Sequence, residues 1–193
     1  MFLNSWSSGH KFSVKAAYVF FRGADDAGPW TKALVHARIV PSHKFICSLA
    51  ARQQLTIVDN LQKRGFWFIN RCALCEGALE THIHIFFQCP FSYEVWTKIQ
   101  QWMGIYCIGG SLQQILEIVV TGRQHRQWEQ VWFQTSLAAT VHQLWAERNV
   151  KIFQGRKNVG ANIVRRIQFL VSVRMLMWKN HNQYSFIVAR LCS

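Results

Sequence analysis

A mainly α-helical chain is predicted by two patterns in this sequence of 193 residues. Apolar residues recur at i, i+3, i+4 and i+7 over residues 125–153 and again over 161–179, which is the spacing of one face of an amphipathic helix. Shorter apolar segments in the first 65 residues end at glycine or proline. Between these parts, three of the six cysteines fall within residues 72–89. We therefore expect helical regions on both sides of a compact cysteine-rich knuckle.

Short helices are predicted in the N-terminal third. They cover residues 14–21, 42–52 and 56–64, and an apolar segment at 30–39 lies between the first two. Ser13 and Ser42 are suitable N-cap residues because a serine oxygen can accept a hydrogen bond from the first turn. Gly65 can end the third helix, since glycine readily adopts the left-handed conformation of a C-terminal stop. We expect aromatic side chains to pack these helices together.

An antiparallel helical hairpin is predicted in the C-terminal third. The apolar face of its first helix carries Trp128, Val131, Trp132, Thr135, Ala138, Val141, Leu144 and Trp145. A basic turn at residues 155–160 separates this helix from the second, at 161–179, and a short connection makes neighbouring helices antiparallel. The tryptophans and methionines of both helices are interpreted as core residues. Residues 105–122 are ambiguous between helix and strand.

Composition limits the possible classes of function. Half of the residues are hydrophobic and 16% are charged, against about 25% charged in a typical globular chain, which excludes global disorder. The net charge of +13 favours polyanions or acidic surfaces as partners. This charge lies in the flanks, because residues 72–110 hold one Lys and three Glu. No apolar run reaches 18 residues and Met1–Lys11 lacks the pattern of a secretory signal, so we expect an intracellular, reducing setting and no membrane partner.

The cysteines and histidines of residues 72–89 have the spacing of metal ligands. Cys72 and Cys75 form a Cys-x2-Cys pair, and His84 and Cys89 follow within twenty residues. Two thiolates on one turn and two ligands on a nearby helical turn can complete a tetrahedral Zn²⁺ site. A redox Cys-x-x-Cys is the alternative, but the βαβ context of such motifs is missing. The remaining cysteines, Cys47, Cys107 and Cys192, are interpreted as packing or incidental thiols.

His82 competes with His84 for the fourth ligand position. On a helix, His82 and Cys89 would lie two turns apart, roughly 10 Å along the axis, which makes His82 the poorer partner. His84 and Cys89 are five residues apart, so the helix must have an irregular or ending turn there. Pro90 allows such an ending. We therefore predict one structural zinc ion per chain, held by Cys72, Cys75, His84 and Cys89.

Several motifs, in the order in which that family has them, resemble the reverse-transcriptase zinc-binding domain of plant non-LTR (LINE-type) retroelements. The knuckle motif is Cys-x-x-Cys, then Glu80-Thr81-x-x-His84-Ile85-Phe86-Phe87-x-Cys89-Pro90, then Val95-Trp96. Upstream, the segments Gly9–Tyr18, Pro41–Phe45 and Leu55–Gly65 agree with the family, and Leu144–Asn149 looks like the tail that follows the domain. The resemblance implies that His84 is the ligand histidine. It implies a domain at 6–103, which leaves a linker at 104–124 and a basic helical hairpin at 125–193.

No enzymatic activity is expected from the residues present. In the retroelements that the chain resembles, this domain follows the polymerase, whose chemistry needs paired aspartates on a hydrophobic hairpin. Asp25 and Asp26 are the sole adjacent pair, and they lie in a segment rich in Gly and Pro. Three aspartates in the whole chain are too few for a ribonuclease H site.

The expected function is nucleic-acid binding, with RNA or DNA as the partner. Candidate phosphate contacts are Lys63, Arg64, Arg71, Arg165 and Arg166. Phe66, Trp67 and Phe68 could stack on bases, but we favour them as the core around the metal. Alternatives are a structural domain that binds an acidic protein and a degenerate retroelement fragment without selected activity. A reverse transcriptase or another retroelement protein is a further expected partner, and the expected location is nuclear.

Overall fold

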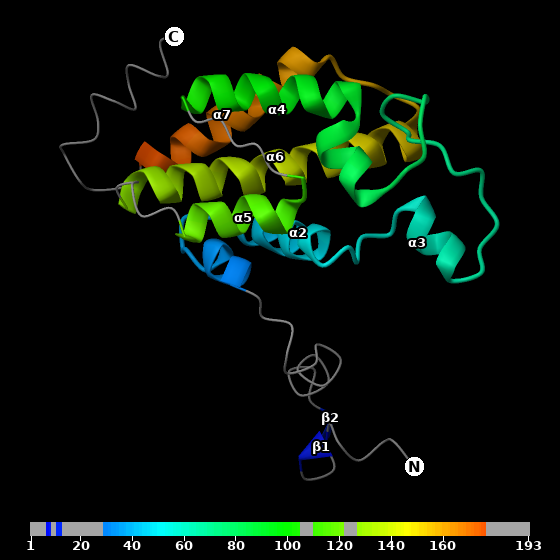
Figure 1. Cartoon of the computed structure of the whole chain (residues 1–193), viewed down its shortest axis with the longest axis horizontal. Coiled ribbons are helices and arrows are strands. Elements are labelled where there is room, and N and C mark those ends of the chain that lie inside the picture. Colours follow the sequence, from blue (N-terminus) through cyan, green and yellow to red (C-terminus); the bar gives the residue numbers. More distant parts are fainter. Residues whose placement is uncertain (1–6, 9–10, 13–28, 105–109, 122–126, 177–193) are drawn as a thin grey trace.

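The computed structural model describes residues 7–8, 11–12, 29–104, 110–121 and 127–176 of the chain (Figure 1). Its elements are β1 (Ser7–Ser8), β2 (Lys11–Phe12), the 3-10 helix η1 (Pro29–Leu34), α2 (Pro41–Ala51), α3 (Val58–Lys63), the π-helix η2 (His84–Gln88), α4 (Pro90–Met103), α5 (Leu112–Thr121), α6 (Gln127–Gln154) and α7 (Gly160–Leu176). The two strands pair antiparallel over two residues each. The predicted mainly α-helical class is confirmed. The helix expected at 14–21 lies outside the described residues.

The N-terminal helices α2 and α3 start and end close to their predicted limits. The prediction of Ser42 as the N-cap is wrong, because α2 begins at Pro41, Val40 is its N-cap residue and no side chain caps it. Proline suits this first position because its ring fixes φ near the helical value and its missing N–H would have no partner there. α3 ends at Lys63, and Gly65 follows with a φ of +87°, the left-handed conformation that the sequence predicted.

α6 and α7 form the antiparallel hairpin that the sequence predicts (Figure 1). Its predicted apolar face is buried, including Val131, Trp132, Thr135, Ala138, Val141, Leu144 and Trp145 on α6 and Ile163, Val164, Ile167, Val171 and Met175 on α7. The turn between the helices is fixed by Glu147, whose carboxylate accepts hydrogen bonds from the backbone N–H of Asn158 at 2.6 Å and from its Nδ2 at 2.7 Å. These bonds hold the chain just before α7 begins.

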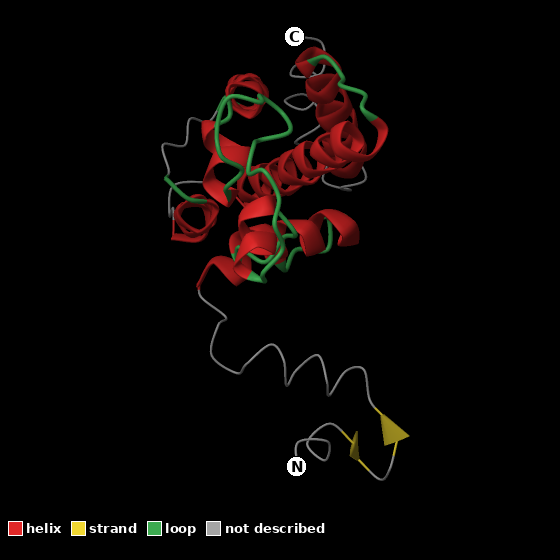
Figure 2. Ribbon diagram, turned by 90° about the vertical axis from the view of Figure 1, so that its right-hand side faces the viewer, coloured by secondary structure: helices red, strands yellow, loops and turns green. Residues whose placement is uncertain are grey.

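The described helices gather into one body (Figure 2), and α6 lies in its middle (Figure 1). α6 packs against α2, α4, α5 and α7, and buried residues of all five belong to one hydrophobic core. The segment 104–124, expected as a linker, contains α5, which buries Leu112, Ile115, Leu116 and Val119 against η1 and α6. Of residues 105–122, which are ambiguous in sequence, Leu112–Thr121 are therefore helical. Among the described helices, none combines the length and apolar character needed to cross a membrane.

Candidate metal centre

The Cys-x2-Cys segment is a tight turn closed by its own backbone. The N–H of Cys72 donates to the carbonyl of Ala78 at 2.7 Å, and the N–H of Glu76 donates to the carbonyl of Cys72 at 2.8 Å. Glu76 adopts a φ of +60°, the left-handed region that reverses the chain direction. This turn holds Cys72 and Cys75 next to each other.

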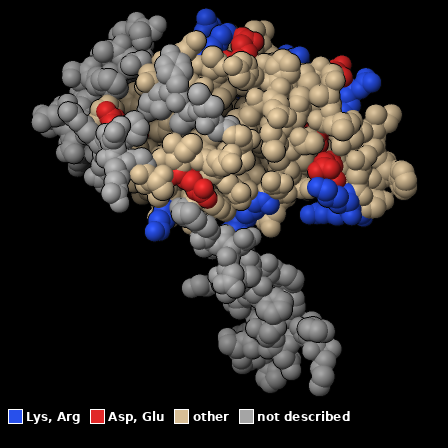
Figure 3. Space-filling model, in the orientation of Figure 1, with Lys and Arg blue, Asp and Glu red and all other residues tan. Residues whose placement is uncertain are grey.

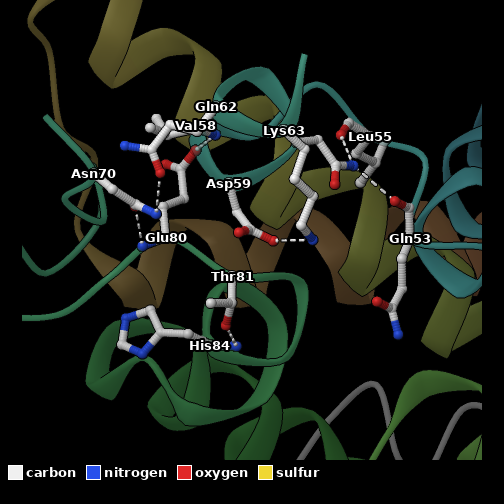
Figure 4. Close-up of polar contacts among 11 residues, drawn as sticks. Gln53, Leu55, Val58, Asp59, Gln62, Lys63, Asn70, Glu80, Thr81 and His84 are labelled. Carbon is white, nitrogen blue, oxygen red and sulfur yellow. Dashed lines mark hydrogen bonds and ion pairs between the residues drawn. The ribbon is translucent and has the colours of Figure 1, made fainter. Parts of the chain in front are cut away.

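An irregular helical turn carries the other two candidate ligands. The N–H of Cys89 donates to the carbonyl of His84 at 2.7 Å, the five-residue hydrogen bond of a π-helix. A π-turn brings residues five apart onto one face, so the spacing of His84 and Cys89 is satisfied and the predicted irregular turn is confirmed. Thr81 supports the start of this segment, because its Oγ1 accepts a hydrogen bond from the N–H of His84 at 3.1 Å (Figure 4).

The structure brings Cys72, Cys75, His84 and Cys89 together, with all four ligand atoms within 4.8 Å of one another. The Sγ atoms of Cys72 and Cys89 are 4.0 Å apart, and Cys75 Sγ lies 3.3 Å from His84 Nε2. Two thiolates bound to one tetrahedral Zn²⁺ at about 2.3 Å lie about 3.8 Å apart. The observed separations therefore fit this ion. Cys75 is half-buried and the other three ligands are buried, so the site is largely shielded from water.

His82 and Cys47 lie outside this group. His82 is buried and its pKa is lowered to about 4, mainly by burial. Cys47 is fully buried in the core, which raises the pKa of its thiol to about 12 and keeps it protonated. The interpretation of Cys47 as a packing thiol agrees with this environment. Cys107 and Cys192 lie outside the described residues.

The electrostatics of the cluster favour a thiolate at Cys89. A hydrogen bond from the Cys72 thiol lowers the pKa of Cys89 to about 5, and the backbone N–H groups of Ser92 and Phe91 in the first turn of α4 act in the same direction. The pKa of Cys72 is raised, first by its hydrogen bond to Cys89 and then by burial. These hydrogen bonds favour loss of the Cys89 proton, and a metal ion binds the deprotonated thiol.

A buried ion pair ties the knuckle to α6. Glu80 and Arg148 are 0% and 5% exposed, and Arg148 Nε donates to Glu80 Oε2 at 3.2 Å while its Nη2 donates to Oε1. Glu80 also accepts the N–H of Val58 at 3.0 Å and donates its own N–H to Asn70 at 2.7 Å (Figure 4). Sequence reasoning missed this pair because its members are 68 residues apart. Both lie in segments that carry the family resemblance, which is the signal that could have indicated them.

The five predicted phosphate contacts fall into two groups. Lys63, Arg64 and Arg71 are exposed at α3 and at the beginning of the knuckle, and Arg165 and Arg166 are exposed on α7. α3 and α7 lie far apart, at different ends of the helical body (Figure 1). Lys63 also forms an ion pair with Asp59 at 2.8 Å. The structure therefore does not bring the five residues into one surface.

The preferred interpretation of Phe66, Trp67 and Phe68 as a core around the metal is wrong. Their exposed fractions are 55%, 98% and 53%. The apolar side chains next to the ligands come instead from Leu74, Ile85 and Phe86, which are buried. The Phe66–Phe68 run follows Gly65 in an extended segment outside any helix, so its side chains have no core face to point into.

Comparison with known proteins agrees with this geometry. Residues 12–96 match the family model described as zinc-binding in reverse transcriptase, and all four ligands of the cluster lie inside the matched range. No curated protein and no solved structure is significantly similar to the chain. The match and the three-thiolate, one-imidazole donor set both indicate zinc as the metal. Residues 12–96 of the chain are therefore similar to the family described as zinc-binding in reverse transcriptase, and the Cys-Cys-His-Cys cluster lies within them.

Proposed function

We propose that this chain is a retroelement-derived, zinc-stabilised module that binds RNA or DNA and has no polymerase or nuclease site of its own. The observation that carries the proposal is the position of Lys63, Arg64 and Arg71, which are exposed beside a closed Cys3His cluster. The metal would fix the knuckle, and the cations beside it would contact phosphates.

Zinc in this site has a structural role. Three thiolates and one imidazole fill a tetrahedral coordination sphere, which leaves no position for a reactive water. When bound, the ion supplies folding free energy to the knuckle. The protein's own residues then hold the knuckle against α6, through Glu80 and Arg148, and present the cations of α3 to the solvent.

The surface near α3 is the favoured interface. Lysines and arginines form separate groups near the edges of the visible face, several of them beside acidic residues (Figure 3). Residues 59–76 hold Lys63, Arg64 and Arg71 against two acidic residues, Asp59, which is ion-paired with Lys63, and Glu76, which is ion-paired with Lys151 from α6. A local excess of positive charge attracts a polyanion more strongly than cations that are scattered among carboxylates.

The carboxylates of the described residues support a non-catalytic role. Glu80 and Glu147 are buried, and both are occupied by structural partners, Arg148 and Asn158. Within the described ranges, the Cys3His cluster is the one group of three or more potential metal-ligating side chains. A two-metal active site would need further carboxylates to converge. A nuclear location and association with a reverse transcriptase belong to the same proposal.

The test is a salt-dependent titration with RNA and DNA. We expect binding of fluorescent oligonucleotides to weaken steeply between about 50 and 200 mM salt, as phosphate contacts do. The double variant Arg64→Gln/Arg71→Gln should lower the slope of log K against log salt by about 0.7 to 0.9 for each lost contact. Lys98→Gln is the matched control, because Lys98 is exposed and ion-paired with Glu94 on α4.

Absent binding at low salt would contradict the proposal. Binding that does not depend on salt would contradict it as well, and would favour the alternative of a domain that recognises another protein.

A further inference from the structure

Four consecutive large apolar side chains are exposed beside the knuckle. Phe66, Trp67, Phe68 and Ile69 are 55%, 98%, 53% and 88% exposed, and we refer to residues 66–69 as the aromatic loop. Single exposed apolar residues are common, but a contiguous group of this size marks an interaction site.

The aromatic loop is held in place at both ends. At its start, the N–H of Phe66 donates to the carbonyl of Leu61 at 3.1 Å. Farther along, Gln62 Nε2 donates to the carbonyl of Phe68 at 2.9 Å, and Asn70 accepts the N–H of Glu80 at 2.7 Å. These bonds connect the loop to α3 on one side and to the buried Glu80 on the other. None of these hydrogen bonds involves the side chain of Trp67, so the loop holds that side chain in solvent without relying on it.

The geometry of the rings suits flat ligands. The rings of Phe66 and Phe68 are stacked, with centroids 6.3 Å apart and planes at 23°. The indole of Trp67, between them in sequence, has nearly its whole surface free. Aromatic faces exposed in this way can stack on nucleobases, each of which has a π-face of its own.

The charges around the aromatic loop define the class of ligand. Lys63 and Arg64 precede it and Arg71 follows it. A ligand that matches this arrangement carries flat apolar groups along an anionic backbone. Single-stranded nucleic acid has this chemistry, whereas a duplex keeps its bases stacked inside and offers mainly phosphates.

We propose that the aromatic loop stacks on unpaired bases and that the partner of this domain is single-stranded nucleic acid. This inference rests on the proposed nucleic-acid-binding function and deepens it. Trp67 is the principal stacking residue, and Arg64 and Arg71 hold the backbone on either side of it.

The experiment compares one sequence as a single strand and as a duplex, with the full zinc-loaded chain. Trp67→Ala should weaken single-strand binding about tenfold and leave duplex binding nearly unchanged, because loss of one stacked base has an effect of this size. Trp67→Phe should restore most of the affinity. Phe45→Ala is the matched control, since Phe45 is 57% exposed and stands beside Lys44 on another helix, α2. Zinc content and helical circular dichroism should stay unchanged in every variant.

The outcomes separate this inference from the proposed function. Unchanged single-strand affinity in Trp67→Ala, with salt-dependent binding that Arg64→Gln/Arg71→Gln still weakens, would overturn the stacking role and leave nucleic-acid binding intact. Absence of binding to the single strand and to the duplex at low salt would overturn both the stacking role and the proposed nucleic-acid-binding function. A loss of binding to phosphatidylserine vesicles in Trp67→Ala, without a loss on oligonucleotides, would assign the loop to a membrane and contradict the inference.

Discussion

The knuckle and the α6–α7 hairpin differ in what stabilises them. In the hairpin, fully buried apolar side chains such as Leu137, Leu144 and Ile167 fill the space between long helices. In the knuckle, residues 72–81 contain no helix and one short helical turn follows at 82–88, and the chain is positioned by turn hydrogen bonds, by the cysteine and histidine cluster and by Glu80. The knuckle has little regular structure, and its conformation therefore depends on a few strong, specific interactions rather than on an extended apolar core.

The free energies of these interactions support the dependence of the knuckle on the metal. Structural zinc binding contributes about 10–16 kcal/mol of apparent folding free energy in zinc-finger peptides. Truncation of one buried leucine costs about 2–5 kcal/mol. Loss of the metal should therefore destabilise the knuckle more than truncation of any single buried side chain destabilises the hairpin.

Metal removal should have the largest effect and should separate the two regions. With a chelator present, we expect hydrogen exchange to accelerate at the amides of Cys72 and Cys89, whose hydrogen bonds close the knuckle. The amides in the middle of α6 should stay protected, because apolar burial holds that helix. Equal loss of protection in both regions would show that the two parts unfold as one unit. Unchanged exchange at the knuckle would contradict its dependence on the metal.

Substitution of Glu80 should have the next largest effect, because it breaks the link between the two regions. Glu80→Ala leaves the buried charge of Arg148 without its partner, which costs about 3–5 kcal/mol. The exposed pair of Lys98 and Glu94 is the control, and Glu94→Ala should cost at most about 1 kcal/mol. Urea denaturation of the wild type, Glu80→Ala and Glu94→Ala measures the free energy of unfolding of each. Similar losses in Glu80→Ala and Glu94→Ala would refute the structural role of the buried pair.

The buried His43, which lies against the half-buried His142, should produce a smaller, pH-dependent effect in the α2–α6 packing. The rings of His43 and His142 lie 4.4 Å apart. Burial, His142 and Arg174 lower the pKa of His43 to about 4, so the folded state keeps it neutral. An unfolded histidine takes up a proton near pH 6.5, and stability should therefore fall as the pH drops from about 6.5 toward 4. His43→Phe should reduce this dependence in denaturation measured at several pH values. An equally steep dependence in the variant would exclude His43 as its source.

Much of the fold could be predicted from the sequence because its signals are local. The i, i+3, i+4 spacing of apolar residues predicted α6 and α7, and Gly65 predicted the end of α3. The five-residue spacing of His84 and Cys89 predicted an irregular turn, which the π-helix supplies. In each case the information lies within one or two helical turns.

The features that were missed depend on contacts between distant parts of the chain. The pairing of Glu80 with Arg148 joins residues with no local signal for each other. Hydrophobicity alone favours burial of Phe66, Trp67 and Phe68, yet a short run of consecutive apolar residues has no periodicity that tells which side faces a core. The exposure of the aromatic loop follows from the surrounding fold, in which Gln62 ties the loop to α3 and Asn70 ties its far end to Glu80.

Zinc content per chain tests the central claim most directly, by elemental analysis of the purified wild type and of Cys72→Ser, His84→Ala and His82→Ala. We expect about one zinc per chain in the wild type, loss of zinc in Cys72→Ser and His84→Ala, and retention in His82→Ala, because His82 lies outside the cluster. A folded wild-type protein without zinc, or equal loss of zinc in the two histidine variants, would contradict the assignment of Cys72, Cys75, His84 and Cys89 as the metal ligands.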